Sequence, residues 1–370
     1  MINTKKGDSN KTHNNVSQQF FIFIILLFFL VPASIQVPFR VLLLFAFNIY
    51  LFGVNKRMGG YFFLLIISIF FLVYKYVVGT FDTSLLMVLL SVGPVYFFDA
   101  IAETILRIDR KRMLGVVIAS IIGVVGQLFF FRYEGRLNMS YEINQSASYL
   151  FLLLLLCDFL QFKKTGVLVF ILGSLLLSRL FLLSSFIFLF LKYFKNFLPR
   201  FVFNISFTKI IFIFFILTSV FSFWYAINMA ENIGETSDSA SRIKSVNDGS
   251  NLLRFYINMK VLEGVYEGDE QLIMKGYGNL PDNTVYIDEY IGQPHNELVK
   301  HIAQYGIIFT LFLLFVSRNY YSKVCRYETA EYLFPIVLYT QFLWVRFTII
   351  PSLEMLFIFY LLTYKMYKLT

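Results

Sequence analysis

Long apolar runs alternate with short polar segments along most of this chain. Many of these runs approach the roughly 20 residues that a helix needs to cross the hydrocarbon core of a membrane. Turn-forming or charged residues such as Val37-Pro38 and Pro199-Arg200 separate most of them. The pattern predicts an all-α fold, a polytopic integral membrane bundle of about 12 transmembrane helices. The expected spans are 19–36, 38–54, 60–79, 83–104, 113–131, 146–160, 165–178, 180–194, 210–230, 299–317, 331–350 and 353–368.

One long polar segment, 231–300, interrupts the alternation. We expect residues 1–370 to form a single integral membrane domain, with 231–300 as an external loop, periplasmic or extracellular. Composition agrees, because 58% of the residues are hydrophobic, only 15% are charged and the mean hydropathy is +0.68. No water-soluble core requires so much apolar surface.

The positions of the basic residues predict the orientation. Lys and Arg in short loops stay on the cytoplasmic side of a membrane. With a cytoplasmic amino terminus and an uncleaved first helix, most of the cations fall in alternate loops, both termini are cytoplasmic and 231–300 is outside. The net charge of +9 is then a signal of topology and requires no nucleic acid. The inner cations are Lys5, Lys6, Lys11, Lys56, Arg57, Arg107, Arg110, Lys111, Arg112, Lys163, Lys164, Lys192, Lys195, Arg200, Lys209, Arg318, Lys323, Arg326, Lys365 and Lys368.

The cations expected on the outer side are candidates for function, because a charge that faces lipid is costly. Arg40, Lys75 and Arg346 lie near helix ends, where snorkelling to the headgroups explains them. Arg179 lies in GSLLLSRLFLLSSF between two short spans. We expect the Ser178-Arg179 pair to turn inside the bundle near its outer side, and Arg179 to be functional.

Arg254 lies within the polar segment, in NLLRFYINMKVLEG. Helical spacing gives this stretch an apolar stripe suited to the membrane interface, formed by Leu252, Phe255, Tyr256, Met259 and Leu262. Arg254 on its flank would grip the oxygens of a lipid-linked diphosphate bidentately. A surface arginine that balances Glu263 or Glu267 is the alternative.

Metal and cofactor chemistry are not expected. The chain has no Asp-x-Asp to hold a divalent ion on a diphosphate, and Asp288-Glu289 is the nearest acidic pair. His295 and His301 are six residues apart, which does not place them on one helix face. No nucleotide-binding, nucleophile-elbow or haem motif occurs.

The stretch PHNELVKHIAQYG, at the end of the polar segment, supplies a candidate base. His295 over the outer mouth of the bundle would take a proton from a sugar hydroxyl, and Glu297 is the competing base. Asn296 reads as a helix N-cap, and capping is also the alternative role for His295. Gly276 and Gly278, in KGYGNLP, indicate a tight turn or a close approach to a substrate.

Taken in order, these residues resemble the bacterial O-antigen polymerase and O-antigen ligase superfamily, whose late loop commonly reads R, then GxG, then hNxxl, then G. The matches are Ser178-Arg179, Arg254, Gly276 with Gly278, His295-Asn296 and Gly306. The architecture matches over most of the chain, but the motifs cover only about 165–310. SRLFLLSS departs from the small residues that often follow Ser-Arg, which puts close helix packing there in doubt.

The resemblance implies a metal-independent glycosyltransferase, an O-antigen or capsular polysaccharide polymerase in the bacterial cytoplasmic (inner) membrane. It would join repeat units carried on undecaprenyl diphosphate, which serve as donor and acceptor, beside a chain-length regulator and a flippase of the same pathway. By position, Arg179 and Arg254 would hold the diphosphate, Arg242 would be a weaker second cation, and His295 would activate the acceptor. Asn296, Glu297, Gly276 and Gly278 complete the expected substrate site.

Three alternatives remain open. An O-antigen ligase shares the donor and the chemistry and differs in its acceptor. A lipid-linked oligosaccharide flippase or another transporter also suits twelve helices, but it should line its central helices with charge, and these spans are nearly charge-free by sequence. A structural or signalling protein that uses the loop as a binding module would not explain Arg179.

Overall fold

The computed structural model describes most of the chain. The described residues are 5–54, 58–79, 83–98, 108–133, 136–141, 143–198, 249–278, 285–287, 290–292, 296–324, 329, 331–333, 335–336 and 351–367.

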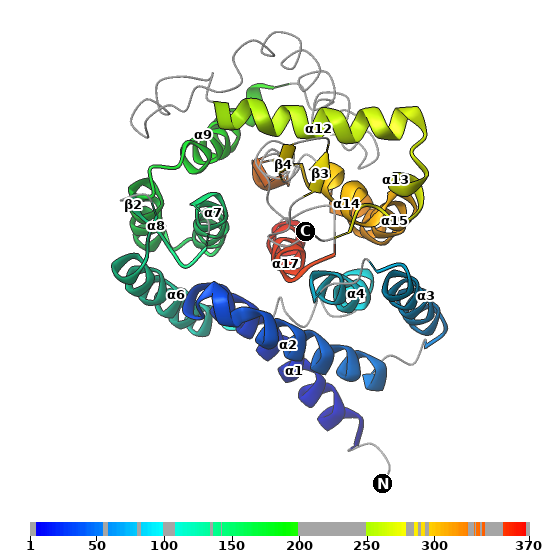
Figure 1. The fold of residues 1–370 in the computed structure, drawn as a ribbon. Coiled ribbons are helices and arrows are strands. Elements are labelled where there is room, and N and C mark those ends of the chain that lie inside the picture. Colours follow the sequence, from blue (N-terminus) through cyan, green and yellow to red (C-terminus); the bar gives the residue numbers. More distant parts are fainter. Residues whose placement is uncertain are drawn as a thin grey trace.

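Helices make up almost all of the described structure, with two short antiparallel hairpins (Figure 1). The hairpins pair β1 (Arg132–Tyr133) with β2 (Arg136–Leu137), and β3 (Val285–Ile287) with β4 (Tyr290–Gly292). The fold is therefore all-α, as the hydropathy pattern predicts. The helices are α1 (Lys5–Leu30), α2 (Ala33–Val54), α3 (Met58–Val77), α4 (Thr83–Tyr96), α6 (Arg110–Phe130), α7 (Ile143–Phe159), α8 (Lys163–Leu175), α9 (Arg179–Phe194), the 3₁₀ turn η1 (Lys195–Phe197), α12 (Gly249–Glu267), α13 (Glu270–Met274), α14 (Glu297–Tyr305), α15 (Ile307–Val324) and α17 (Leu353–Tyr367).

The boundary between the first two helices differs from the prediction. The break expected at Val37-Pro38 is wrong, because α1 ends at Leu30 and α2 begins at Ala33, which leaves Pro38 inside α2. The interruption falls instead at Val31-Pro32. Pro38 is the sixth residue of α2, just beyond the first turn, so its missing N–H costs the helix one hydrogen bond, the one to the carbonyl of Ser34.

The predicted span 299–317 is two helices. Gly306 has a φ of 85° and separates the amphipathic α14 from the apolar α15. A continuous helix cannot pass through this left-handed conformation. The polar segment and the bundle therefore meet at a corner.

Length and hydropathy allow three helices of the described chain to cross a membrane: Ala33–Gly53, Arg110–Phe130 and Arg179–Phe197. The described residues also contain six shorter apolar helices. The expected span 210–230 lies outside the described residues, and so does most of 331–350. The structure is compatible with a membrane protein, and the number twelve stays a prediction.

Helix α17 lies near the centre of the bundle, where it contacts α1, α4, α7 and α15 (Figure 1). The core there is rich in aromatic rings, and the centroid of the Phe21 ring lies 4.0 Å from that of Tyr360.

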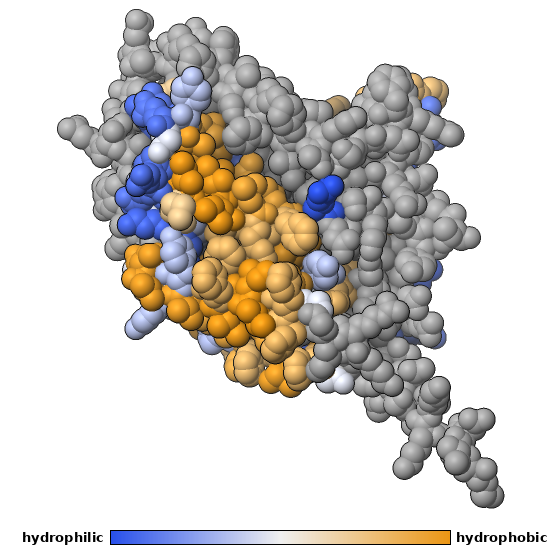
Figure 2. Space-filling view, turned by 90° about the vertical axis from the view of Figure 1, so that its right-hand side faces the viewer, coloured by the Kyte–Doolittle hydropathy of each residue, from blue (hydrophilic) through white to orange (hydrophobic). Residues whose placement is uncertain are grey.

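The outer side of the bundle is apolar too. Figure 2 shows a broad hydrophobic face on the side of the molecule where α3 and α15 lie in Figure 1. Exposed aromatic residues of these two helices include Phe63 and Phe70, 62% and 65% exposed, and Phe315. Apolar surface this extensive is typical of contact with lipid or with another protein.

Helix α12 runs across the view of Figure 1, whereas α7, α17 and α15 are seen nearly end-on. It packs on a second small core with α13 and α14, in which Val261 meets Leu272 and Leu298. The buried face of α12 contains Ile257 and Val261, whereas Met259 and Leu262 of the predicted stripe are only half-buried. Among the described side chains of α12, these two stripe residues are therefore not the most deeply buried.

Candidate functional site

A buried ion pair joins the second helix of the bundle to the last. The Nη1 atom of Arg40, on α2, lies 2.6 Å from Oε1 of Glu354, on α17, and the two side chains are only 13% and 6% exposed. Tyr149 on α7 completes the arrangement, because its hydroxyl donates to Glu354 Oε1 at 2.7 Å and accepts from Arg40 Nη2 at 2.9 Å. Each charge thus has hydrogen-bonded partners, as burial in a low-dielectric interior demands.

Two further side chains extend this polar network. Gln36 lies one helical turn before Arg40, and its Oε1 accepts from Arg40 Nη2 at 2.7 Å and from Nε at 3.1 Å. Its amide nitrogen donates to the carbonyl of Leu27 and to the hydroxyl of Tyr141. The network therefore fixes the guanidinium in one orientation.

This geometry overturns two expectations from the sequence. Arg40 does not snorkel to the headgroups; its side chain points into the bundle toward Glu354. The spans are also not nearly charge-free, since α2, α3 and α17 contribute Arg40, Lys75 and Glu354 to the interior. Arginine and glutamate 314 residues apart leave no local signature of pairing.

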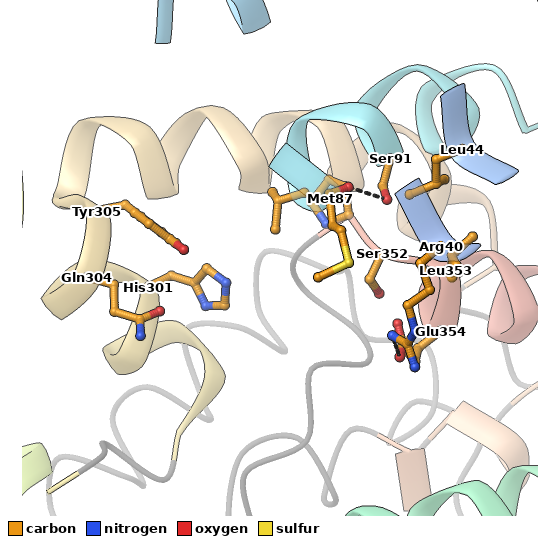
Figure 3. Close-up of a pocket in the computed structure, with 12 residues that line it drawn as sticks. Arg40, Leu44, Met87, Ser91, His301, Gln304, Tyr305, Ser352, Leu353 and Glu354 are labelled. Carbon is orange, nitrogen blue, oxygen red and sulfur yellow. Dashed lines mark hydrogen bonds and ion pairs between the residues drawn. The ribbon is translucent and has the colours of Figure 1, made fainter. Parts of the chain in front are cut away.

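The ion pair lines one end of a small pocket (Figure 3). At the other end are His301, Gln304 and Tyr305 of α14, with Met87 and Ser91 of α4 between the two ends. The volume of ≈ 40 Å³ is room for about three water molecules, so the pocket admits one functional group and not a sugar ring. His301 is 4% exposed, and its ring centroid lies 5.8 Å from that of Tyr305.

Helix α14 begins where the sequence predicts. The Asn296 side chain is the N-cap: its Oδ1 accepts from the backbone N–H groups of Leu298 at 2.9 Å and Val299 at 3.2 Å. This satisfies two of the donors that a helix start leaves open. Asn296 is 1% exposed, so its capping role is confirmed, and any role toward a substrate stays a prediction.

The Gly-x-Gly segment docks on the far end of α14. The N–H of Tyr277 donates to the carbonyl of Ala303 at 2.7 Å, and that of Gly278 to Gln304 at 3.1 Å. Gly276 has a φ of 69°, and a Cβ there would lie 2.5 Å from the carbonyl carbon of Gln304. The segment therefore makes its close approach, at Gly276, to the protein backbone, and an approach of these glycines to a substrate stays a prediction.

Lys75 of α3 fastens the same junction. Its ammonium donates to the carbonyl of Lys275 at 2.7 Å and to that of Tyr305, and the whole residue is fully buried. The snorkelling role expected for Lys75 is therefore wrong. Carbonyls at the end of a helix carry partial negative charge, which favours an ammonium there.

Asp269 and Tyr277 hold the preceding turn. The Tyr277 hydroxyl donates to Asp269 Oδ2 at 2.7 Å, and Oδ1 of the same carboxylate accepts from the N–H of Gln271 at 2.7 Å. The hydrogen bond from Tyr277 lowers the pKa of the Asp269 carboxyl. Because the ionised form accepts both bonds, the carboxylate orders the connection from α12 to the Gly-x-Gly segment.

The Ser178-Arg179 pair forms the turn between α8 and α9, but the expectation that the pair turns inside the bundle holds only for Ser178, which is 4% exposed, whereas Arg179 is exposed. Ser178 is the N-cap of α9 and accepts from the N–H of Phe181 at 3.5 Å, and Arg179 is the exposed first residue of the helix. The packing in this turn is tight, because a Cβ on Gly173 would lie 2.1 Å from the Phe181 ring. The close packing doubted for this turn is therefore present, and it depends on Gly173, which precedes Ser178-Arg179.

The other expected site residues are only partly placed. The backbone puts Arg254 on α12 and Glu297 at the first position of α14. Arg242 and His295 lie outside the described residues, as does the snorkelling candidate Arg346. The structure thus gathers Gly276, Gly278 and Asn296 around α14, whereas Arg179 begins a helix that packs on α7 and α8.

The sequence reasoning missed the residues around the buried pocket. Glu354 offered one available signal, since it is a carboxylate in an apolar stretch and such a residue is a functional candidate by default. In the part of the chain that the structure covers, no three His, Cys, Asp or Glu side chains group as metal ligands.

The fold and the site define a helical protein with a buried polar pocket and membrane-compatible apolar helices. Comparison with protein-family models, curated proteins and solved structures gives no match.

Proposed function

We propose that this protein is a membrane glycosyltransferase, a polymerase of O-antigen or capsular repeat units carried on undecaprenyl diphosphate. The observation that carries the proposal is the pocket beside α14, where Arg40, Glu354 and His301 line one buried space. The pocket has room for one functional group of a lipid-linked glycan, a phosphate or a hydroxyl, and it offers a cation for the charge and acid–base groups for the hydroxyl. The loop residues that carry the resemblance include Gly276, Gly278 and Asn296, and they lie at the two ends of the same helix, α14.

In the proposed reaction, an acceptor hydroxyl attacks the anomeric carbon of the donor glycan. The new glycosidic bond forms as the bond to the lipid diphosphate breaks, and the hydroxyl proton passes to a base, His295 or Glu297. Arg254 and Arg179, with Arg242, neutralise the departing diphosphate without a metal. Asn296 and the Gly276-to-Gly278 turn position α14 beside this chemistry.

The membrane placement belongs to the same proposal. The basic short loops put both termini in the cytoplasm and segment 231–300 outside. The transverse helix α12 then lies near the outer interface, where a lipid-linked diphosphate presents its charge. The bilayer and the lipid-linked oligosaccharide are the proposed partners, with a chain-length regulator and a flippase of the same pathway.

A direct test supplies the purified protein, reconstituted in vesicles, with a labelled lipid-linked repeat unit. A ladder of longer glycans on a gel is expected, and the Arg254→Ala and Arg179→Ala variants should lose it while Lys164→Gln keeps it. Failure of the intact chain to extend the unit would count against the polymerase. In cells, deletion should leave one repeat unit on its final carrier, whereas long polymer that stays lipid-linked would indicate the ligase.

The buried pair of Arg40 and Glu354 also favours a second candidate, a transporter of lipid-linked oligosaccharide. Charges between central helices are typical of substrate pathways in transporters. The same vesicles discriminate the two, because a flippase moves the labelled lipid between leaflets without lengthening its glycan.

A further inference from the structure

A second pocket lies between α7, α8 and α9, away from the ion pair. Its volume is ≈ 930 Å³, at the upper end of the range for sites that hold an organic ligand. Helices α8 and α9 both pack on α7. They meet tightly at their connecting turn, where Gly173 abuts the Phe181 ring. The pocket extends from there toward the start of α8 and the end of α9.

The walls of this α8–α9 pocket are apolar. Val167 and Phe170 line it from α8, and Phe188 and Leu189 line it from α9. Val167 is 60% exposed and Leu189 is 40% exposed, so the pocket opens to the outside of the bundle. Helix α9 with η1 forms one of the three stretches of the described chain that are long and apolar enough to cross a membrane. The opening therefore faces the region where acyl chains would lie.

The opposite end of the pocket is basic. Lys163, at the first position of α8, and Lys192, in the last turn of α9, both line it. Asp158 is the one carboxylate of the lining, and it is engaged by Lys192 and by the Tyr332 hydroxyl at 2.8 Å. The guanidinium of Arg110 lies 5.4 Å from the ring centroid of Phe162, another lining residue. The charge at this mouth is therefore net positive.

We propose that the α8–α9 pocket binds an anionic phospholipid of the cytoplasmic leaflet. The acyl chains would lie between α8 and α9, and the phosphate would meet Lys163. Charge complementarity selects this ligand, because apolar walls alone accept any chain whereas the lysine end favours a negative headgroup. The proposal rests on the membrane placement given above and is independent of glycosyl transfer.

Native mass spectrometry of the full-length protein, with phosphatidylglycerol and phosphatidylcholine supplied together, tests the site. We expect preferential retention of phosphatidylglycerol. Lys163→Gln should weaken it about fivefold, the effect of one lysine near an anionic headgroup. Lys164→Gln is the matched control, because Lys164 is exposed beside Lys163 but does not line the pocket.

A second pair of variants tests the apolar walls. Leu189→Trp fills the pocket and should reduce phosphatidylglycerol binding strongly, whereas Leu182→Trp, at an exposed position of the same helix that is not in the lining, should not. Three outcomes would each overturn the proposal. The first is an equal loss of binding for Lys163→Gln and Lys164→Gln, the second is no preference for phosphatidylglycerol over phosphatidylcholine, and the third is stronger retention of a polyprenyl phosphate. If a variant fails to fold, amine-reactive labelling of the wild-type protein tests the site instead. Phosphatidylglycerol should protect Lys163 from the reagent and leave Lys164 reactive. Equal labelling of the two lysines would refute the site.

Discussion

Arg40 and Glu354 form a buried ion pair, 2.6 Å from Nη1 to Oε1, although one lies near the start of the chain and the other near its end. Through it and Tyr149, helices α2, α7 and α17 share a single polar junction. The junction borders the pocket beside α14. At this pocket the first and last parts of the bundle jointly supply charged groups to one cavity.

Removing one member of this pair should be costly. Arg40→Ala leaves the Glu354 carboxylate buried without its cation, and we expect a loss of about 3–5 kcal/mol in the free energy of unfolding. Thermal unfolding in detergent measures the effect. Arg318→Ala, at an exposed position of α15, is the control and should change little. The double variant Arg40→Met/Glu354→Leu should recover most of the stability; if it also regains activity, the pair is structural only.

Lys75→Met should loosen the docking of the Gly-x-Gly segment on α14. The variant removes hydrogen bonds from an ammonium to two carbonyls, each worth about 1.5–3 kcal/mol when a charged group takes part. Faster hydrogen exchange of the Tyr277 and Gly278 amides is the expected readout. Lys275→Met keeps the backbone carbonyl that Lys75 binds and should leave exchange unchanged. Identical behaviour of the two variants would contradict the fastening role of Lys75.

Gly276→Ala and Gly268→Ala separate backbone strain from steric clash. Both glycines have a positive φ, of 69° and 80°, but a Cβ meets backbone only at Gly276, whereas nothing lies within 4 Å at Gly268. Both substitutions cost the strain of a left-handed alanine, about 1–2 kcal/mol. Gly276→Ala should lose roughly 1–3 kcal/mol more from overpacking. Equal unfolding temperatures for the two variants would argue against tight docking of the segment on α14.

Asn296 permits a test of capping against substrate binding. Asn296→Ala should destabilise the protein by about 1 kcal/mol, and Asn296→Ser should restore stability, because serine also caps. Serine lacks the amide group, however. Recovery of both stability and activity by serine indicates a cap alone, whereas recovery of stability without activity indicates that the amide also meets the substrate.

The Asp269–Tyr277 hydrogen bond predicts a pH dependence. Folding lowers the pKa of the Asp269 carboxyl, so its contribution to stability is fully present above the ordinary aspartate pKa of about 4 and is lost as the pH falls through the lowered value. Exchange of the 268–278 region, corrected for intrinsic rates, should rise over that acid range. Tyr277→Phe should move the rise to higher pH, and Asp269→Asn should remove it. A rise at the same pH in wild type and Tyr277→Phe would exclude this pair as its cause.

Local sequence determined the helical class, most helix positions and individual caps. Runs of apolar residues form the helices of the bundle. Asn296 and Ser178 cap α14 and α9, because capping involves only the next three residues. The sequence shows a glycine at position 306, but it does not show that this glycine adopts a positive φ and ends α14. Whether the glycine ends a helix depends on the backbone of Met274 and Lys275, which packs against it.

Only the tertiary structure decided which charges are buried and with whom. The sequence places Arg40 and Lys75 near helix ends, where snorkelling is the simplest expectation. Their burial depends on partners 314 and 200–230 residues away, Glu354 for one and the carbonyls of Lys275 and Tyr305 for the other. Hydropathy and helix periodicity carry information over a few turns of one helix, whereas the cost of burying a charge is settled by the groups that the complete fold brings around it.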